Sequence, residues 1–109
     1  MVRVSRFEFT ERYPVTVPGW KLRGIFEDEL ILERDADVSG ILKRDLVVRS
    51  GVRAIVHGIV EGSVVVEPDA VVYLEAIVKG AVDVRGAGCL EGIMSGALTA
   101  SPDAVVCLE

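Results

Sequence analysis

Hydrophobic and polar residues alternate with a period of two over most of this chain. Between Asp45 and Glu91 every charged residue has an odd number. Side chains along a strand point alternately to its two faces, so the pattern predicts strands whose even-numbered residues share one interior. A helix would require a period near 3.6 and would lose this parity. The aliphatic residues expected inside are Val48, Val56, Val60, Val64, Val66, Val72, Leu74, Val78, Val84 and Leu90.

The alternation is organised into coils of 16 or 18 residues, and the segment Glu67–Glu75 returns 34 positions later as Ser101–Glu109. A fixed period indicates stacked repeats. Each coil contains three short apolar segments, separated by the Gly, Pro, Asp and Ser residues that turn a chain sharply, and we expect each segment to form a short strand. We therefore expect an all-β protein, a single-stranded parallel β-solenoid (β-helix) of about five coils, the fifth ending at Glu109. The coils begin at Leu30, Leu46, Val64, Val82 and Leu98.

Two kinds of solenoid fit this pattern. The six-residue spacing of a left-handed hexapeptide β-helix fits Val60 to Leu90 but fails at Gly96 and Pro102. The 16-residue coils are also two residues short of three hexapeptides. Parallel crossovers are strongly biased to the right hand. The sequence therefore favours a right-handed solenoid, with the left-handed form as the alternative.

The first 20 residues differ from the rest, and we expect a cap or arm over 1–20 followed by a solenoid domain over 21–109. Five of the six aromatic residues lie in the first 26 positions. Val2, Val4, Phe7 and Phe9 alternate with polar residues as in a strand. Because a solenoid needs a cover at its open end, we expect an N-terminal aromatic cap strand over the first coil. The alternative is a basic-aromatic arm that contacts a membrane.

Units such as His57–Gly62 followed by Val64–Ala70 resemble the bactofilins, bacterial proteins whose right-handed β-helical core polymerises end to end. The resemblance covers residues 30–109 and lies in composition and coil length, without an enzymatic motif. It implies a non-enzymatic structural or scaffold protein whose partner is itself. The sequence departs from the family in having no long Pro/Ser-rich tail.

Composition and charge narrow the classes of function. The net charge is −5, yet residues 1–23 carry five basic and two acidic side chains. The remaining surface is acidic and would repel nucleic acid. Two cysteines and the absence of a long apolar run predict a cytoplasmic protein. A small acidic module that binds one protein, such as a toxin-neutralising immunity protein, is the alternative function.

No pattern in the sequence predicts chemistry. His57 is the single histidine and has the outward parity, which is unlike the histidine base of hexapeptide acyltransferases. Cys89 and Cys107 lie 18 residues apart, so we expect free thiols stacked on adjacent coils, too far apart for a relaxed disulfide. One His and two Cys make an unconvincing zinc site. We therefore predict no enzyme, no catalytic residue, no cofactor and no metal.

One outward column of apolar residues is the candidate interface. Isoleucine recurs five times in it, at steps of 16, 18, 18 and 16. Nearby columns add Ile55, Tyr73, Cys89 and Cys107, and separately Val47 and Val65. Continuous apolar stripes on a surface commonly mark interfaces. The alternatives are that the N-terminal strand lies along this stripe or that a corner turns it inward. The candidate interface residues are Ile25, Ile41, Ile59, Ile77 and Ile93, with Ile55 and Tyr73 beside them.

Overall fold

The computed structural model describes residues 1–14 and 18–108 and shows a parallel β-solenoid of about five turns, as the sequence predicts. Two sheets form its walls. In spatial order, the larger sheet contains β1 (Val2–Val4), β12 (Val105–Leu108), β10 (Ala87–Met94), β8 (Val71–Val78), β6 (Arg53–Val60), β4 (Ala36–Leu42) and β2 (Lys21–Phe26). The smaller sheet contains β11 (Leu98–Ala100), β9 (Val82–Val84), β7 (Val64–Val66), β5 (Leu46–Val48) and β3 (Leu30–Leu32).

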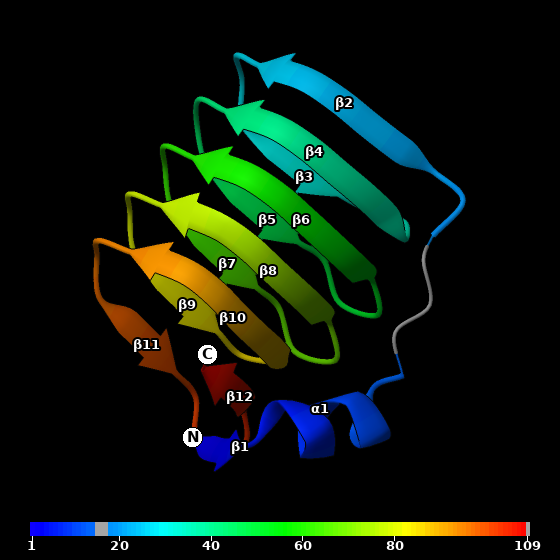
Figure 1. The fold of residues 1–109 in the computed structure, drawn as a ribbon, viewed down its shortest axis with the longest axis vertical. Helices are drawn as coiled ribbons and strands as arrows, with labels where there is room; N and C mark the ends of the chain where they lie inside the picture. The colour runs from blue at the N-terminus through cyan, green and yellow to red at the C-terminus, as the bar shows by residue number, and fades with distance from the viewer. Residues whose placement is uncertain (15–17, 109) are drawn as a thin grey trace.

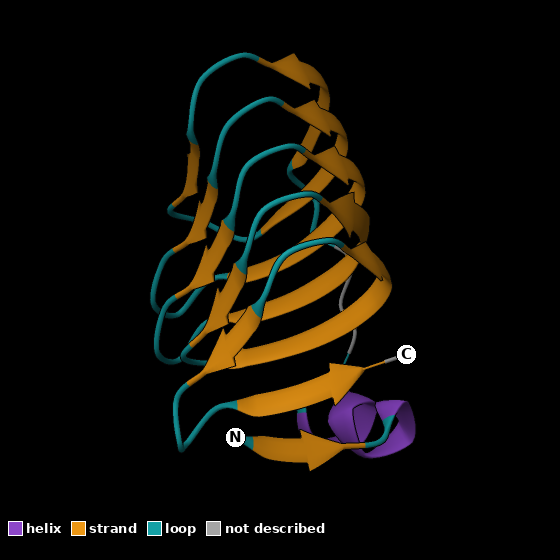
Figure 2. Cartoon of the chain, turned by 90° about the vertical axis from the view of Figure 1, so that its left-hand side faces the viewer, coloured by secondary structure: helices purple, strands orange, loops and turns teal. Residues whose placement is uncertain are grey.

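The chain winds through the two sheets in alternation. In Figure 1 the long strands lie nearer the viewer and run toward the left, and the short strands return behind them as the coils descend. Figure 2 shows the same winding from the side. This sense of winding is right-handed, as the crossover preference indicates.

The core lies between the sheets and consists of the even-numbered aliphatic residues. All ten that the sequence places inside are buried: Val48, Val56, Val60, Val64, Val66, Val72, Leu74, Val78, Val84 and Leu90. The coils start where the repeats predict, because Leu46 pairs with Val64 and Val64 with Val82. The parity therefore persists from coil to coil.

Each coil has two strands instead of the three that the sequence suggests. The second and third apolar segments form one long strand that bends at a glycine. Gly24, Gly40 and Gly58 stand in register at this bend with φ of 131°, 136° and 120°. Only glycine adopts such angles readily. A Cβ atom on Gly58 would also collide with the carbonyl oxygen of Gly40.

The N-terminal segment differs from the expected cap in both its form and its position. After the short β1 it forms a helix, α1 (Arg6–Arg12). β1 pairs with β12, so the segment covers the last coil and not the first; Figure 1 shows both elements at the bottom of the stack, far from β2. The parts of the expected arm and fifth coil at 15–17 and 109 lie outside the described residues.

Local sequence explains the helix. The Ser5 hydroxyl accepts a hydrogen bond from the Glu8 backbone N–H and so caps the first turn, and the Glu8 carboxylate pairs with Arg12 one turn later. A Ser-x-x-Glu sequence is the signature of a capping box. This signal outweighs the period-two pattern of Phe7 and Phe9, which predicted a strand.

Candidate interaction surface

The isoleucine column follows the glycine bend on the outside of the larger sheet. Ile25 pairs with Ile41, and the register continues without a break to Ile93. Ile25, Ile77 and Ile93 are 60%, 38% and 60% exposed, and the two between them are half-buried. Neighbouring strands are ~4.8 Å apart, so the column is about 19 Å long. The structure places all five isoleucines together on the surface.

Ile55 and Tyr73, the residues expected to widen this stripe, are buried beneath α1. They belong to a second apolar cluster with Phe9, whose ring lies edge-on to Tyr73 with 5.3 Å between the ring centroids. The Tyr73 hydroxyl donates a hydrogen bond to the Tyr13 backbone carbonyl. Burial raises the pKa of Tyr73. The N-terminal segment thus covers this apolar column and leaves the isoleucine column exposed.

A column of charged residues separates the two apolar columns and holds α1 in place. His57, Glu75 and Glu91 stand in register in it. Arg6 of the helix forms ion pairs with Glu91 and, at 3.8 Å, with Glu75. The hydrogen bond to Glu91 raises the pKa of Arg6. The sequence pattern did not indicate that Arg6 and Phe9 anchor this helix. The capping sequence at Ser5 could have indicated the helix itself.

His57 points outward, as its parity predicts, and its side chain is 44% exposed. Its Nδ1 lies 3.3 Å from a Glu75 carboxylate oxygen and its Nε2 lies 3.9 Å from one of Asp37. These contacts place His57 in a cluster of polar side chains at the surface. Among the residues that the structure describes, no three His, Cys, Asp or Glu side chains are placed to hold a metal ion.

The two cysteines occupy the covered column. Cys89 pairs with Cys107 in register, and both are free and buried beside Phe9. Burial raises the pKa of the Cys89 thiol far above its usual value, and the neighbouring Cys107 raises it further. Nucleophilic cysteines require the opposite shift, because the thiolate is the reactive form. The Cys89 thiol is therefore poorly suited to act as a nucleophile.

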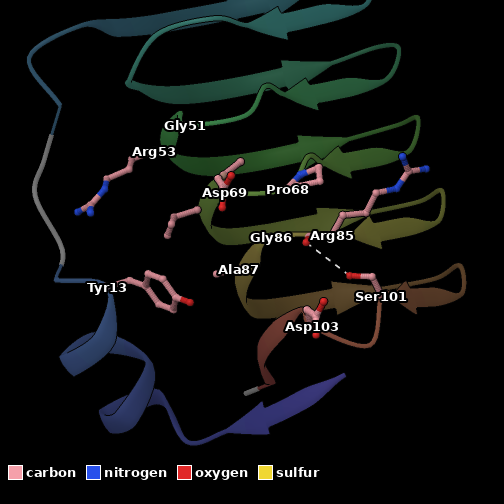
Figure 3. A pocket seen from close by; sticks show the side chains of 12 residues that line it. Tyr13, Gly51, Arg53, Pro68, Asp69, Arg85, Gly86, Ala87, Ser101 and Asp103 are labelled. Atoms are coloured by element: carbon pink, nitrogen blue, oxygen red, sulfur yellow. Dashed lines mark hydrogen bonds between the residues drawn. The ribbon is translucent and has the colours of Figure 1, made fainter.

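A groove of about 610 Å³ runs along the corner that leads into the long strands (Figure 3). Its wall contains four charged residues, Arg53, Asp69, Arg85 and Asp103, and the Ser101 hydroxyl donates a hydrogen bond to the Arg85 carbonyl. Arg53 and Arg85 point in different directions, and all four charged residues are exposed. The groove therefore lacks a group of converging polar side chains of the kind that binding sites use.

No family model, curated protein or solved structure matches this chain. Its single described helix is too short to cross a membrane.

Proposed function

We propose that this protein is a non-enzymatic structural protein that self-associates through the isoleucine column. The observation that carries the proposal is the exposed, in-register run from Ile25 to Ile93. Monomeric proteins seldom expose long continuous apolar patches.

The repeat itself favours a second copy as the partner. An isoleucine column can pack against the same column of another molecule because both have the spacing of the strands. The chain already buries a neighbouring apolar column, that of Ile55 and Tyr73, beneath α1. The bactofilin-like repeats are consistent with a self-associating role. Bactofilin kinship and a cytoplasmic location stay predictions.

The test replaces Ile59 and Ile77 together by threonine. Threonine retains a β-branched shape, so far-UV circular dichroism is expected to show an unchanged fold. Losing these apolar groups removes about 1–2 kcal/mol per residue from a contact, which would weaken association at least about tenfold. Sedimentation velocity over a concentration series measures the change.

The matched control is the double variant Val47→Thr and Val65→Thr. These two valines are also outward, half-buried and in register, but they lie on the smaller sheet. The control variant is expected to associate like the parent. If the isoleucine variant also associates like the parent, the column is not the interface. A parent protein that stays monomeric would contradict self-association and favour the acidic protein-binding module, which the net charge of −5 supports.

A further inference from the structure

The N-terminal end of the solenoid presents a free strand edge. β2 is the terminal strand of the larger sheet, and no segment in the described ranges pairs with its outer side. Leu22 and Phe26 point toward the core but are only half-buried. Their partners in the next coil, Val38 and Leu42, are fully buried. An unpaired edge beside exposed apolar groups is a template for another strand.

The opposite end of the larger sheet has a smaller edge. β1 covers β12 from Val105 to Cys107 and is only three residues long, and the chain then turns into α1. Short edge strands and a covering helix are common ways to prevent edge pairing. The six-residue edge of β2 therefore differs in kind from the edge at the other end.

We propose that two copies of this chain join at their N-terminal ends, with the two β2 strands forming an antiparallel pair about a two-fold axis through Gly24. This contact includes one residue of the isoleucine column, Ile25, which would face Arg23 of the second copy. The rest of the column lies outside the contact, so substitutions at Ile59 and Ile77 test the function proposed above separately.

The backbone limits the possible registers. The Trp20 carbonyl accepts a hydrogen bond from the Asp37 N–H, and the Phe26 carbonyl accepts one from the Lys43 N–H. The even-numbered residues of β2 therefore direct their backbone N–H and C=O groups toward β4. Odd-numbered residues such as Arg23 then face the free edge. Residues that exchange both hydrogen bonds in an antiparallel pair stand opposite each other, so odd must face odd.

The bend selects one of these registers. Four of the long strands, β2, β4, β6 and β10, have a positive-φ glycine in the same column, where Gly24 stands over Gly40. Two bent strands fit along their whole length only when their bends coincide, which places Gly24 opposite Gly24 of the second copy. A register centred on Arg23 would instead oppose two guanidinium groups, which is destabilising.

The side chains are complementary in this register. Leu22 faces Phe26 of the second copy on the inner side, which makes the two cores continuous. On the outer side, Lys21 faces Glu27 of the second copy, and both are exposed in the single chain. The two-fold axis creates this pair of opposite charges twice.

Charge reversal tests the register. Lys21→Glu and Glu27→Lys each place like charges opposite each other twice, and each is expected to weaken the dimer about tenfold. The double variant with both changes restores opposite charges and is expected to restore the dimer. Arg3→Glu, on the short β1 at the other end, is the matched control and should leave the dimer unchanged. Sedimentation equilibrium of the full chain measures all four proteins.

A cross-link provides a second readout that does not depend on stability. Within one copy, Lys21 begins β2 and Glu27 directly follows its end, so the extended chain separates them by up to about 20 Å, beyond the reach of a zero-length carbodiimide. A Lys21–Glu27 link between isotopically labelled and unlabelled copies therefore supports the pairing. A monomeric parent, or association that both single charge variants leave intact, would overturn it. The Ile59→Thr and Ile77→Thr variant should keep this link, so the two proposals can fail separately.

Discussion

At the scale of single residues, the glycines of the bend are the strongest constraint. Gly58 combines a φ of 120° with direct stacking on the Gly40 carbonyl. Ala76 occupies the same column without a positive φ, which shows that the bend can tolerate one alanine where the backbone differs. The register of the long strands therefore depends on small residues that have no polar chemistry.

We expect Gly58→Ala to lower the free energy of unfolding by about 3 kcal/mol or more, because backbone strain of about 1–3 kcal/mol adds to a steric collision. Gly51→Ala is the control, since Gly51 also has a positive φ of 81° but has open space around its Cα. Urea unfolding measures both variants. Equal losses would show that the collision is relieved and that strain alone matters.

At the scale of elements, α1 acts as a lid over the outer face of the larger sheet. Its single buried residue is Phe9, which packs in the cluster that contains Cys89 and Cys107. A helix of seven residues is too short to be stable alone, so its stability comes from this packing and from the ion pairs of Arg6. The helix and the sheet face that it covers therefore stabilise each other.

We expect Phe9→Ala to cost about 3–5 kcal/mol and to make both cysteines reactive toward a thiol reagent in the native protein. Phe7→Ala is the control on the same helix, because Phe7 is 75% exposed and its loss should change stability by about 0.5 kcal/mol or less. Thiol labelling followed by mass spectrometry gives the result. If the cysteines of the parent react as fast as those of Phe9→Ala, α1 is not a lid.

At the scale of the whole molecule, one inward face runs continuously through all the coils. Val64, Val66 and their partners in β5 and β9 are fully buried, whereas Val65 between them is outward and stands in register with Asp83. Each coil covers the inward side chains of the next, so a polar group placed there cannot hydrogen-bond to water. In the inner coils, the cost of such a change depends on whether the residue has the inward or the outward parity.

We expect Val66→Thr to lower the free energy of unfolding by about 1–3 kcal/mol, because its hydroxyl is buried in an apolar core. The adjacent Val65→Thr should change it by about 0.5 kcal/mol or less, as an outward substitution. Thermal unfolding followed by circular dichroism compares the two. Equal effects would contradict the inward and outward assignment.

The sequence by itself determined the solenoid, the starts of its coils, its inward residues and the alignment of the five isoleucines. These features follow from the period of two and from the repeat, because both are local patterns that recur in every coil. Even the pairing of Cys89 with Cys107 follows from the 18-residue spacing.

Only the tertiary structure decided which end and which surface the N-terminal segment covers. Val2–Val4 could pair with either terminal strand, and the choice of β12 depends on how α1 packs Phe9 against Tyr73 and Arg6 against Glu91. Those contacts join residues more than 60 positions apart that share no repeat. For the same reason the sequence could not show that Ile55 is covered while Ile25 and the β2 edge stay exposed.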